Sequence, residues 1–247
     1  MIFGIYDINV SNNLNFKERL NLYKKVGFES VGLYIDENYM ENNEQYEDII
    51  LYAKSIGLKI NQVHVCYKLS NDICENTENY ISYMTEKLKV CEKHNIKNMV
   101  LHASKGDNPP IINEQQIKLI ENLANNFKSI NLAFENVRNN NNLKEILKSN
   151  KSNITFCFDL GHANAYNSFD LLDDYSNKIT CSHLHSNHGA DTHELLSSGK
   201  IDYKPIINKL KTLNADLCLE VFPERGTFLN KESFENFVRQ AFNDLVF

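Results

Sequence analysis

One segment of thirteen residues concentrates side chains that bind divalent metals. It contains four of the eight histidines, His183, His185, His188 and His193, together with Asp191. Alternate side chains of a strand share one face, so His183 and His185 are expected to point the same way. Imidazole beside carboxylate suits a divalent metal. A solvated polar loop is the simpler explanation for one isolated histidine, but this density of ligands favours a metal site.

Further histidines and carboxylates follow short apolar runs elsewhere in the chain. They are His64, His102, Glu135, Asp159, His162 and Glu220. With His183, Asp191 and His193 they make five histidines and four carboxylates, and neither Lys nor Arg is among them. Polar strand ends that merely meet solvent would carry Ser, Thr, Asn or Lys as readily. A bound divalent cation explains the bias, because it offsets the repulsion among the carboxylates.

The elements that must position these residues alternate regularly. Eight apolar runs are each followed by a stretch whose apolar residues recur at helical spacing. No linker rich in Pro, Gly or Ser divides the chain. The expected strands are residues 2–6, 30–35, 58–65, 97–102, 130–135, 154–159, 178–185 and 215–222.

The expected strands have near-continuous apolar sequences, which are typical of a parallel sheet covered on both faces. Eight such units predict one α/β domain over residues 1–247, a single (β/α)8 TIM barrel with eight parallel strands. A doubly wound open sheet is the alternative, but neither glycine-rich nucleotide-binding motif is present. Active sites of these barrels lie at the carboxyl ends of the strands, so a barrel would gather the candidate ligands at one rim.

The composition argues against several other classes of protein. A net charge of −6 provides no overall basic field for nucleic acid or anionic lipid, although it does not report on a local basic patch. No window approaches the roughly 18 uninterrupted apolar residues of a membrane span. The first seven residues lack a basic segment and a long apolar run, so no signal peptide is expected. A nucleophile elbow of the GxSxG type is absent as well.

Six cysteines indicate the redox setting. None belongs to a CxxC pair, and several lie in apolar runs, as buried reduced thiols do. They are Cys66, Cys74, Cys91, Cys157, Cys181 and Cys218. We therefore expect a reducing, cytoplasmic setting.

Three further residues are candidates for substrate binding. His185 shares a face with His183 and would either contact the substrate or support the metal ligands. Tyr67 and Lys68 closely follow His64 and would line the mouth of a pocket, although surface exposure is the simpler explanation for both.

The sequence around these candidate ligands resembles that of a known superfamily. The segments that carry the resemblance are Val63-His64-Val65, Val100-Leu101-His102, Phe134-Glu135-Asn136, Phe158-Asp159-Leu160-Gly161-His162, His183-Leu184-His185-Ser186-Asn187, Asp191-Thr192-His193 and Leu219-Glu220-Val221. Their order, over essentially the whole chain, is similar to that of the xylose isomerase-like TIM barrels. This superfamily includes sugar-phosphate isomerases and epimerases and also endonuclease IV.

The isomerase and epimerase branch holds one Mn, Zn or similar ion with two Glu, one Asp and one His. The matching residues are Glu135, Asp159, His183 and Glu220. The resemblance implies that the ion polarises oxygens of a bound sugar or sugar phosphate. It also implies that Glu135 and Glu220 are the catalytic acid/base pair, which moves a proton beside the carbonyl.

The endonuclease IV branch implies another reaction, in which three zinc ions activate water and clamp a phosphodiester of abasic DNA. All nine of its ligands have a match in this chain. The matches are His64, His102 and Glu135 for the first ion, Glu135, Asp159, His183 and Glu220 for the second, and His162, Asp191 and His193 for the third. An enzyme acting on DNA also needs Lys and Arg around its cleft, and the loops show no evident basic track.

We expect a metal-dependent sugar or sugar-phosphate isomerase or epimerase with one to three Zn or Mn ions. The zinc-dependent endonuclease is the alternative enzyme, and DNA is a partner only in that case. A barrel that binds metal or a polyol without turnover is a third hypothesis, and a homo-oligomer is an option for any of them. Two departures from the family lie beside the expected substrate loop. Ser186 stands where Asp is frequent, and residues 197–200, Ser-Ser-Gly-Lys, replace a usual Gly-Glu-Gly segment.

Overall fold

The computed structural model describes residues 2–8, 14–35, 45–65, 67–223 and 229–247. Its eight strands are parallel, pair in chain order and close into a barrel where β8 pairs with β1. They are β1 Phe3–Tyr6, β2 Ser30–Tyr34, β3 Lys59–His64, β4 Asn98–His102, β5 Asn131–Glu135, β6 Ile154–Asp159, β7 Ile179–Leu184 and β8 Asp216–Leu219. The predicted (β/α)8 barrel is confirmed, and the open sheet is excluded.

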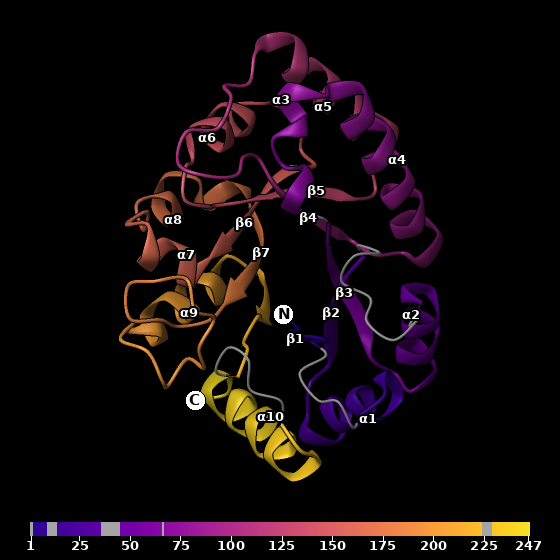
Figure 1. Ribbon diagram of the computed structural model, residues 1–247, viewed down its shortest axis with the longest axis vertical. Helices are drawn as coiled ribbons and strands as arrows, with labels where there is room; N and C mark the ends of the chain where they lie inside the picture. The colour runs from indigo at the N-terminus through magenta and orange to yellow at the C-terminus, as the bar shows by residue number, and fades with distance from the viewer. Residues whose placement is uncertain (1, 9–13, 36–44, 66, 224–228) are drawn as a thin grey trace.

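Helices connect the strands along the outside of the barrel (Figure 1). The longer helices are α1 Phe16–Val26, α2 Tyr46–Ser55, α4 Thr77–His94, α5 Glu114–Asn126, α9 Tyr203–Thr212 and α10 Lys231–Leu245. Shorter segments are α3 Asp72–Glu75, α6 Asn141–Leu147, α7 Leu160–Ala165, α8 Leu171–Asp174 and the 3₁₀ turns η2 Tyr67–Leu69 and η3 Ser176–Lys178. Asn15, Asn113 and Asn230 begin α1, α5 and α10, because each side chain accepts a backbone N–H of the first turn.

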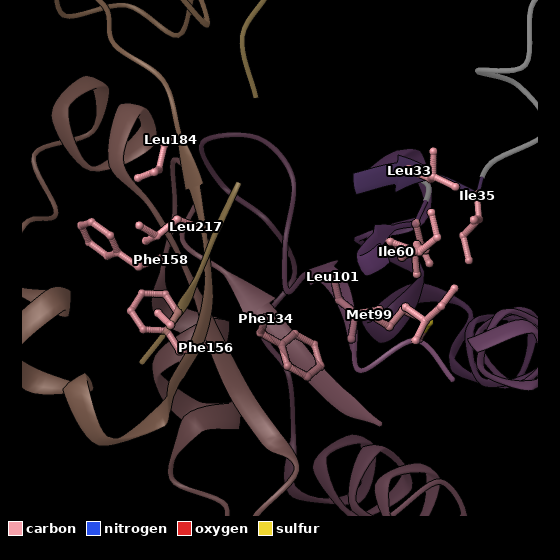
Figure 2. Close-up of a cluster of buried hydrophobic side chains, with 14 of the residues drawn as sticks. Leu33, Ile35, Ile60, Met99, Leu101, Phe134, Phe156, Phe158, Leu184 and Leu217 are labelled. Carbon is pink, nitrogen blue, oxygen red and sulfur yellow. The ribbon is translucent and has the colours of Figure 1, made fainter. Parts of the chain in front are cut away.

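Side chains that point outward from the strands pack against the helices. Figure 2 shows part of this layer, including Leu33, Met99, Phe134, Phe156 and Leu184. All five side chains are buried. Burying one such side chain contributes about 1.5–3 kcal/mol, so this layer holds the barrel and its helices together.

Small side chains from four successive strands meet in the middle of the barrel. A separate buried cluster there consists of Val100, Ala133, Cys157 and Cys181. The next inward position on each strand lies two residues further, at the carboxyl end. Strand register then aligns His102 with Glu135, and Asp159 with His183. The alternation of the strands therefore brings these candidate ligands to one level of the barrel.

Close packing between β1 and β2 explains one glycine. Tyr6 is completely buried at the end of β1. A Cβ atom at Gly32 would lie 2.9 Å from atoms of the Tyr6 ring. Glycine at this position lets the ring stand inside the barrel, just beneath the rim.

Strand β6 runs directly into α7, a helix that apolar periodicity does not predict. Asp159 ends the strand and caps the helix, since its Oδ1 accepts the backbone N–H of His162 at 2.6 Å. The short helix turns His162 back toward the rim.

Two expectations concern the chain as a whole. Within the described residues, no helix has the length and apolar character needed to cross a membrane. The described cysteines are free thiols, buried except for half-buried Cys74, and Cys66 lies outside the described residues.

Candidate metal centre

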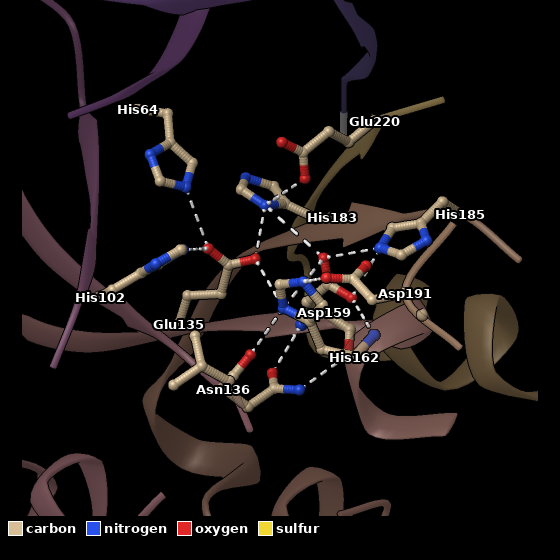
Figure 3. Close-up of polar contacts among 12 residues, drawn as sticks. His64, His102, Glu135, Asn136, Asp159, His162, His183, His185, Asp191 and Glu220 are labelled. Atoms are coloured by element: carbon tan, nitrogen blue, oxygen red, sulfur yellow. Dashed lines mark hydrogen bonds and ion pairs between the residues drawn. The ribbon is translucent and has the colours of Figure 1, made fainter. Parts of the chain in front are cut away.

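The predicted metal ligands meet at the carboxyl-terminal rim of the barrel (Figure 3). Their donor atoms form three groups, and within each group all atoms lie within 4.8 Å of one another. The first group is His64, His102 and Glu135, the second is Glu135, Asp159, His183 and Glu220, and the third is His162, His185, Asp191 and His193. The structure thus assembles all nine expected positions and adds His185.

Glu135 joins the first group to the second. Its Oε2 lies 2.8 Å from Nε2 of His102 and 3.1 Å from Nε2 of His64. Its Oε1 lies 2.9 Å from Nδ1 of His183. The side chain is completely buried, so each carboxylate oxygen serves a different group.

The second group combines four side chains that come from the ends of four successive strands. Nδ1 of His183 lies 3.0 Å from Oε2 of Glu220 and 3.8 Å from Oδ2 of Asp159. Glu135, Asp159 and His183 are completely buried, and Glu220 is 4% exposed. Three carboxylates this close together and this far from water require positive charge beside them.

Backbone carbonyls fix the rings of three histidines. Nδ1 of His64 donates to the carbonyl of Val65 at 2.8 Å. In the same way Nδ1 of His162 donates to the carbonyl of Asn136, and Nδ1 of His193 to that of Glu220, both at 2.9 Å. Histidines that bind metals are commonly held in this way through the other ring nitrogen. The Nε2 atoms of all three are left facing carboxylate oxygens.

This arrangement of donors fits a cation. A neutral imidazole with its hydrogen on Nδ1 presents an Nε2 lone pair to whatever faces it. Nε2 of His64 faces Glu135 at 3.1 Å, and Nε2 of His193 faces Asp191 at the same distance. Two acceptors face each other stably only with a proton or a metal ion between them, so both positions suit metal ligation.

The carboxylates and imidazoles shift one another's pKa values. Burial alone would lower the pKa of His183, but Glu135 and Glu220 outweigh it and raise the pKa well above its ordinary value. Burial is likewise outweighed at His193, where Asp191 and Glu220 raise the pKa to about 9. Burial would raise the pKa of Glu135, but His183 and His102 outweigh it and lower the pKa well below its ordinary value. Protons can therefore supply the positive charge of the rim, and a divalent cation would displace them.

The third group lies nearer to solvent than the other two. Asp191 places Oδ1 at 3.1 Å from Nε2 of His193 and Oδ2 at 3.3 Å from Nε2 of His162. The Asp191 side chain is 32% exposed. An antiparallel bridge between Ser186 and Glu194 folds the loop after β7 back on itself and so brings Asp191 over the rim.

Two tyrosines that the sequence analysis did not single out contact metal-ligand candidates. The hydroxyl of Tyr6 lies 3.1 Å from Nε2 of His183. The hydroxyl of Tyr34 donates to Oε1 of Glu220. Both tyrosines end strands and point inward, at the positions in β1 and β2 that correspond to the ligands elsewhere. Their position at the ends of expected strands is the sequence signal that indicates them.

The three residues expected at the substrate lie in two places. Tyr67 and Lys68 belong to the turn η2 after β3. Tyr67 is half-buried, with Nζ of Lys105 at 5.1 Å from its ring centroid, and Lys68 is exposed. His185 is completely buried inside the rim.

The barrel agrees with a comparison against known protein families. A family model described as xylose isomerase-like TIM barrel matches residues 20–238. The chain belongs to this family. The resemblance inferred from the strand-end segments is thereby confirmed. A comparison with curated protein sequences found no match.

Several solved structures share the fold of this family member at low sequence identity. D-Psicose 3-epimerase from Clostridium cellulolyticum has a TM-score of 0.75 at 13% identity, over 99% of this chain and 98% of that chain. 3-Keto-D-glucoside 4-epimerase from E. coli has a TM-score of 0.74 at 16% identity, over 99% and 98%. A sugar phosphate isomerase/epimerase from Parabacteroides distasonis has a TM-score of 0.71 at 15% identity, over 99% and 94%.

Ser186 and Gly199, which lie in the two segments where the resemblance implies a departure from the family, lie against each other. A Cβ atom at Gly199 would lie 2.2 Å from Oγ of Ser186 and 2.5 Å from the backbone nitrogen of Asn187. Ser186 is completely buried. A small residue at each position therefore allows the close approach, and an Asp at position 186 would need room that this packing does not leave.

Proposed function

We propose that this chain is a divalent-metal-dependent isomerase or epimerase of a small sugar or sugar phosphate, acting as one domain over residues 1–247. The second group carries the proposal. Two Glu, one Asp and one His from successive strands converge within 4.8 Å. This is the ligand set that the family resemblance implies for one Mn or Zn ion.

The second group also offers the groups needed for proton transfer. A bound cation would polarise the carbonyl and hydroxyl oxygens of the sugar. Glu135 and Glu220 both face Nδ1 of His183, with one oxygen of each at 2.9 and 3.0 Å from that atom. One carboxylate would take the proton from carbon and the other would return it.

Both glutamates are suited to act first as bases. Burial alone would raise the pKa of Glu220, but His183 and His193 outweigh it and lower the pKa well below its ordinary value. The pKa of Glu135 is lowered in the same way. Both carboxylates are therefore ionised before the substrate binds, so the one that returns a proton to carbon must first receive it, either from the carboxylate that took it or from water. The hydroxyl of Tyr34, which donates to Oε1 of Glu220, would fix the orientation of that carboxylate.

Similar structures support a sugar as the substrate. Those named above are an epimerase of a ketohexose, an epimerase of a ketoglucoside and a sugar phosphate isomerase/epimerase. We propose that Tyr67 and Lys68, in the turn after β3, contribute to substrate binding from the rim.

A second candidate function rests on one observation, the assembly of all three groups of ligands. Three zinc ions at these groups would give an endonuclease IV-like phosphodiesterase acting on abasic DNA. The loops of the sequence show no evident basic track, which opposes this alternative, because a DNA enzyme must neutralise phosphates around its cleft.

One experiment separates the two functions. Protein loaded with Mn²⁺ or Zn²⁺ is incubated with a panel of ketoses and their phosphates, and also with a duplex that contains an abasic site. We expect new isomeric sugars to appear and the duplex to stay intact. Nicking that EDTA abolishes, without any sugar product, would overturn the proposed function in favour of the nuclease.

A further inference from the structure

His185 is packed in the rim so closely against Gly161 that no side chain fits at that position. It follows β7 and is completely buried. Its ring covers Gly161 in α7, where a Cβ atom would lie 1.9 Å from Cε1 and 2.1 Å from Nδ1 of the imidazole. Glycine at position 161 is therefore required for the ring to lie where it does.

The ring makes two close contacts with metal-ligand candidates. Nε2 lies 3.1 Å from Oδ1 and 3.2 Å from Oδ2 of Asp159, so it faces the open end of the carboxylate (Figure 3). One face of the ring stacks on His193, with centroids 3.8 Å apart and planes 10° from parallel. His185 thus touches one member of the second group and one member of the third.

Stacking argues against His185 as a ligand of the same ion as His193. A histidine binds a metal along the lone pair of its nitrogen, which lies in the plane of the ring. The planes of two rings that are 10° from parallel, with centroids 3.8 Å apart, meet far beyond the length of a metal–nitrogen bond. The ring of His193 is already directed at Asp191, because its Nδ1 is held by the carbonyl of Glu220. His193 is therefore the better placed of the two to bind in the third group.

The hydrogen of His185 belongs on Nε2. Among the described residues Nδ1 has no hydrogen-bond partner, although it is buried. Nε2 faces two carboxylate oxygens, which only accept hydrogen bonds. Placing the hydrogen on Nε2 satisfies this pair and leaves a lone pair, rather than an N–H, without a partner.

We propose that His185 is a positioning residue, which donates its Nε2–H to Asp159 and so presents that carboxylate to the cation of the second group. Oδ1 of Asp159 also accepts the backbone N–H of His162 at 2.6 Å. With Oδ1 held by that N–H, Oδ2, which lies 3.8 Å from Nδ1 of His183, is the oxygen of Asp159 that would be left to hold the cation. This inference rests on the proposed function insofar as the second group binds a divalent cation.

Two substitutions separate the hydrogen bond from the packing of the ring. His185→Phe keeps an aromatic ring against Gly161 and His193 but removes the donor. His185→Gln removes the ring but can reach Asp159 with its amide N–H. His188→Phe is the matched control, because His188 lies on the same loop, is 50% exposed and pairs with Glu194.

The test is a titration of Mn²⁺ into full-length protein that has been stripped of metal with a chelator. Electron paramagnetic resonance of the free ion measures how much Mn²⁺ is bound. We expect the Kd of His185→Phe to rise about tenfold to a hundredfold, as for other residues that support metal ligands. His185→Gln and His188→Phe should stay within about threefold of the wild type. An unchanged Kd in His185→Phe would overturn the proposal, as would an equal loss in His185→Gln.

Folding is checked by circular dichroism of each variant in chelator. Should His185→Phe not fold, the comparison moves to His185→Gln against His185→Asn, whose shorter amide does not reach Asp159. Equal Kd values in that pair would contradict the proposal. Because Mn²⁺ binding is measured without substrate, a protein that binds one ion but converts no sugar would refute the proposed function and leave this inference standing.

Discussion

Oε1 of Glu135 and Nδ1 of His183 lie 2.9 Å apart at the centre of the rim. The same carboxylate turns its other oxygen to His64 and His102. One side chain on β5 thus serves two groups of ligands, and a change of its charge should affect both.

Replacing Glu135 with Gln keeps the shape of the side chain and removes its charge. We expect the Kd for Mn²⁺ to rise by at least about tenfold to a hundredfold and sugar turnover to fall by about 10²–10⁴-fold. Metal analysis and product chromatography measure the two effects. Glu145→Gln, at a surface ion pair with Lys148, is the control and should change neither. Wild-type metal content and turnover in Glu135→Gln would contradict the assignment.

Removing the Tyr6 hydroxyl should destabilise the fold beneath the rim. Whether His183 holds a proton or a cation at Nδ1, its Nε2 carries a hydrogen and donates to the Tyr6 hydroxyl, 3.1 Å away. Tyr6→Phe leaves that buried N–H without a partner, which costs about 1–3 kcal/mol. Urea unfolding in chelator should show the loss as a lower free energy of unfolding. Tyr52→Phe removes a surface hydroxyl bonded to Asn21 and serves as control; equal free energies of unfolding in the two variants would refute the role of Tyr6.

Metal affinity should increase as pH rises. Burial is outweighed by neighbouring carboxylates, which raise the pKa of His193 to about 9 and that of His183 well above its ordinary value. A cation must displace these protons, so binding releases them. Calorimetric Mn²⁺ titrations between pH 6 and 9 should show proton release and a Kd that falls with pH. A Kd independent of pH would show that these imidazoles are not ligands.

Stability of the protein in chelator should change with pH in the opposite direction. The folded pKa of His193, about 9, exceeds the unfolded value of about 6.5. Its contribution to the free energy of unfolding is therefore fully present below about pH 6.5 and is lost as pH rises through about 9. Urea unfolding at pH 6.5 and pH 9 measures this loss. His193→Gln should reduce the difference between the two pH values, and an undiminished difference would show that His193 is not its source.

A side chain at Gly32 should disturb the rim through Tyr6. A Cβ atom there would lie 2.9 Å from the Tyr6 ring. Gly32→Ala should lower the free energy of unfolding by about 1–3 kcal/mol, as overpacking of a core does. Urea unfolding checks this value. Tyr6→Leu removes the ring, so in its background Gly32→Ala should lower the free energy of unfolding by less than in the wild type. If the two substitutions lower the free energy of unfolding additively, the clash is contradicted.

The sequence predicted the fold well because its signals repeat along the chain. Apolar runs ending at His64, His102, Glu135 and Asp159 coincide with strands that end at those residues. Alternation along each strand also determines which side chains point inward, so the convergence of the ligands follows from the sequence alone. The short helix α7 was not predicted, because its six residues are too few for a helical period to show.

Contacts within the rim could not be predicted, because they depend on which strands are neighbours across the closed barrel. Tyr6 lies far from His183 in the sequence, and only closure of the sheet brings its hydroxyl to the ring. The stacking of His185 on His193 depends on the fold of the loop between them. Strand alternation predicted the direction of His185 but not that its ring would be completely buried.

The most direct test of the proposed proton transfer is solvent deuterium exchange. Metal-loaded protein is incubated in D₂O with the panel of ketoses and ketose phosphates, and deuterium on carbon is measured by NMR or mass spectrometry. We predict incorporation at a carbon beside the carbonyl of at least one sugar, and its loss in both Glu135→Gln and Glu220→Gln. No incorporation with any sugar, from protein shown to hold a metal ion, would contradict the account.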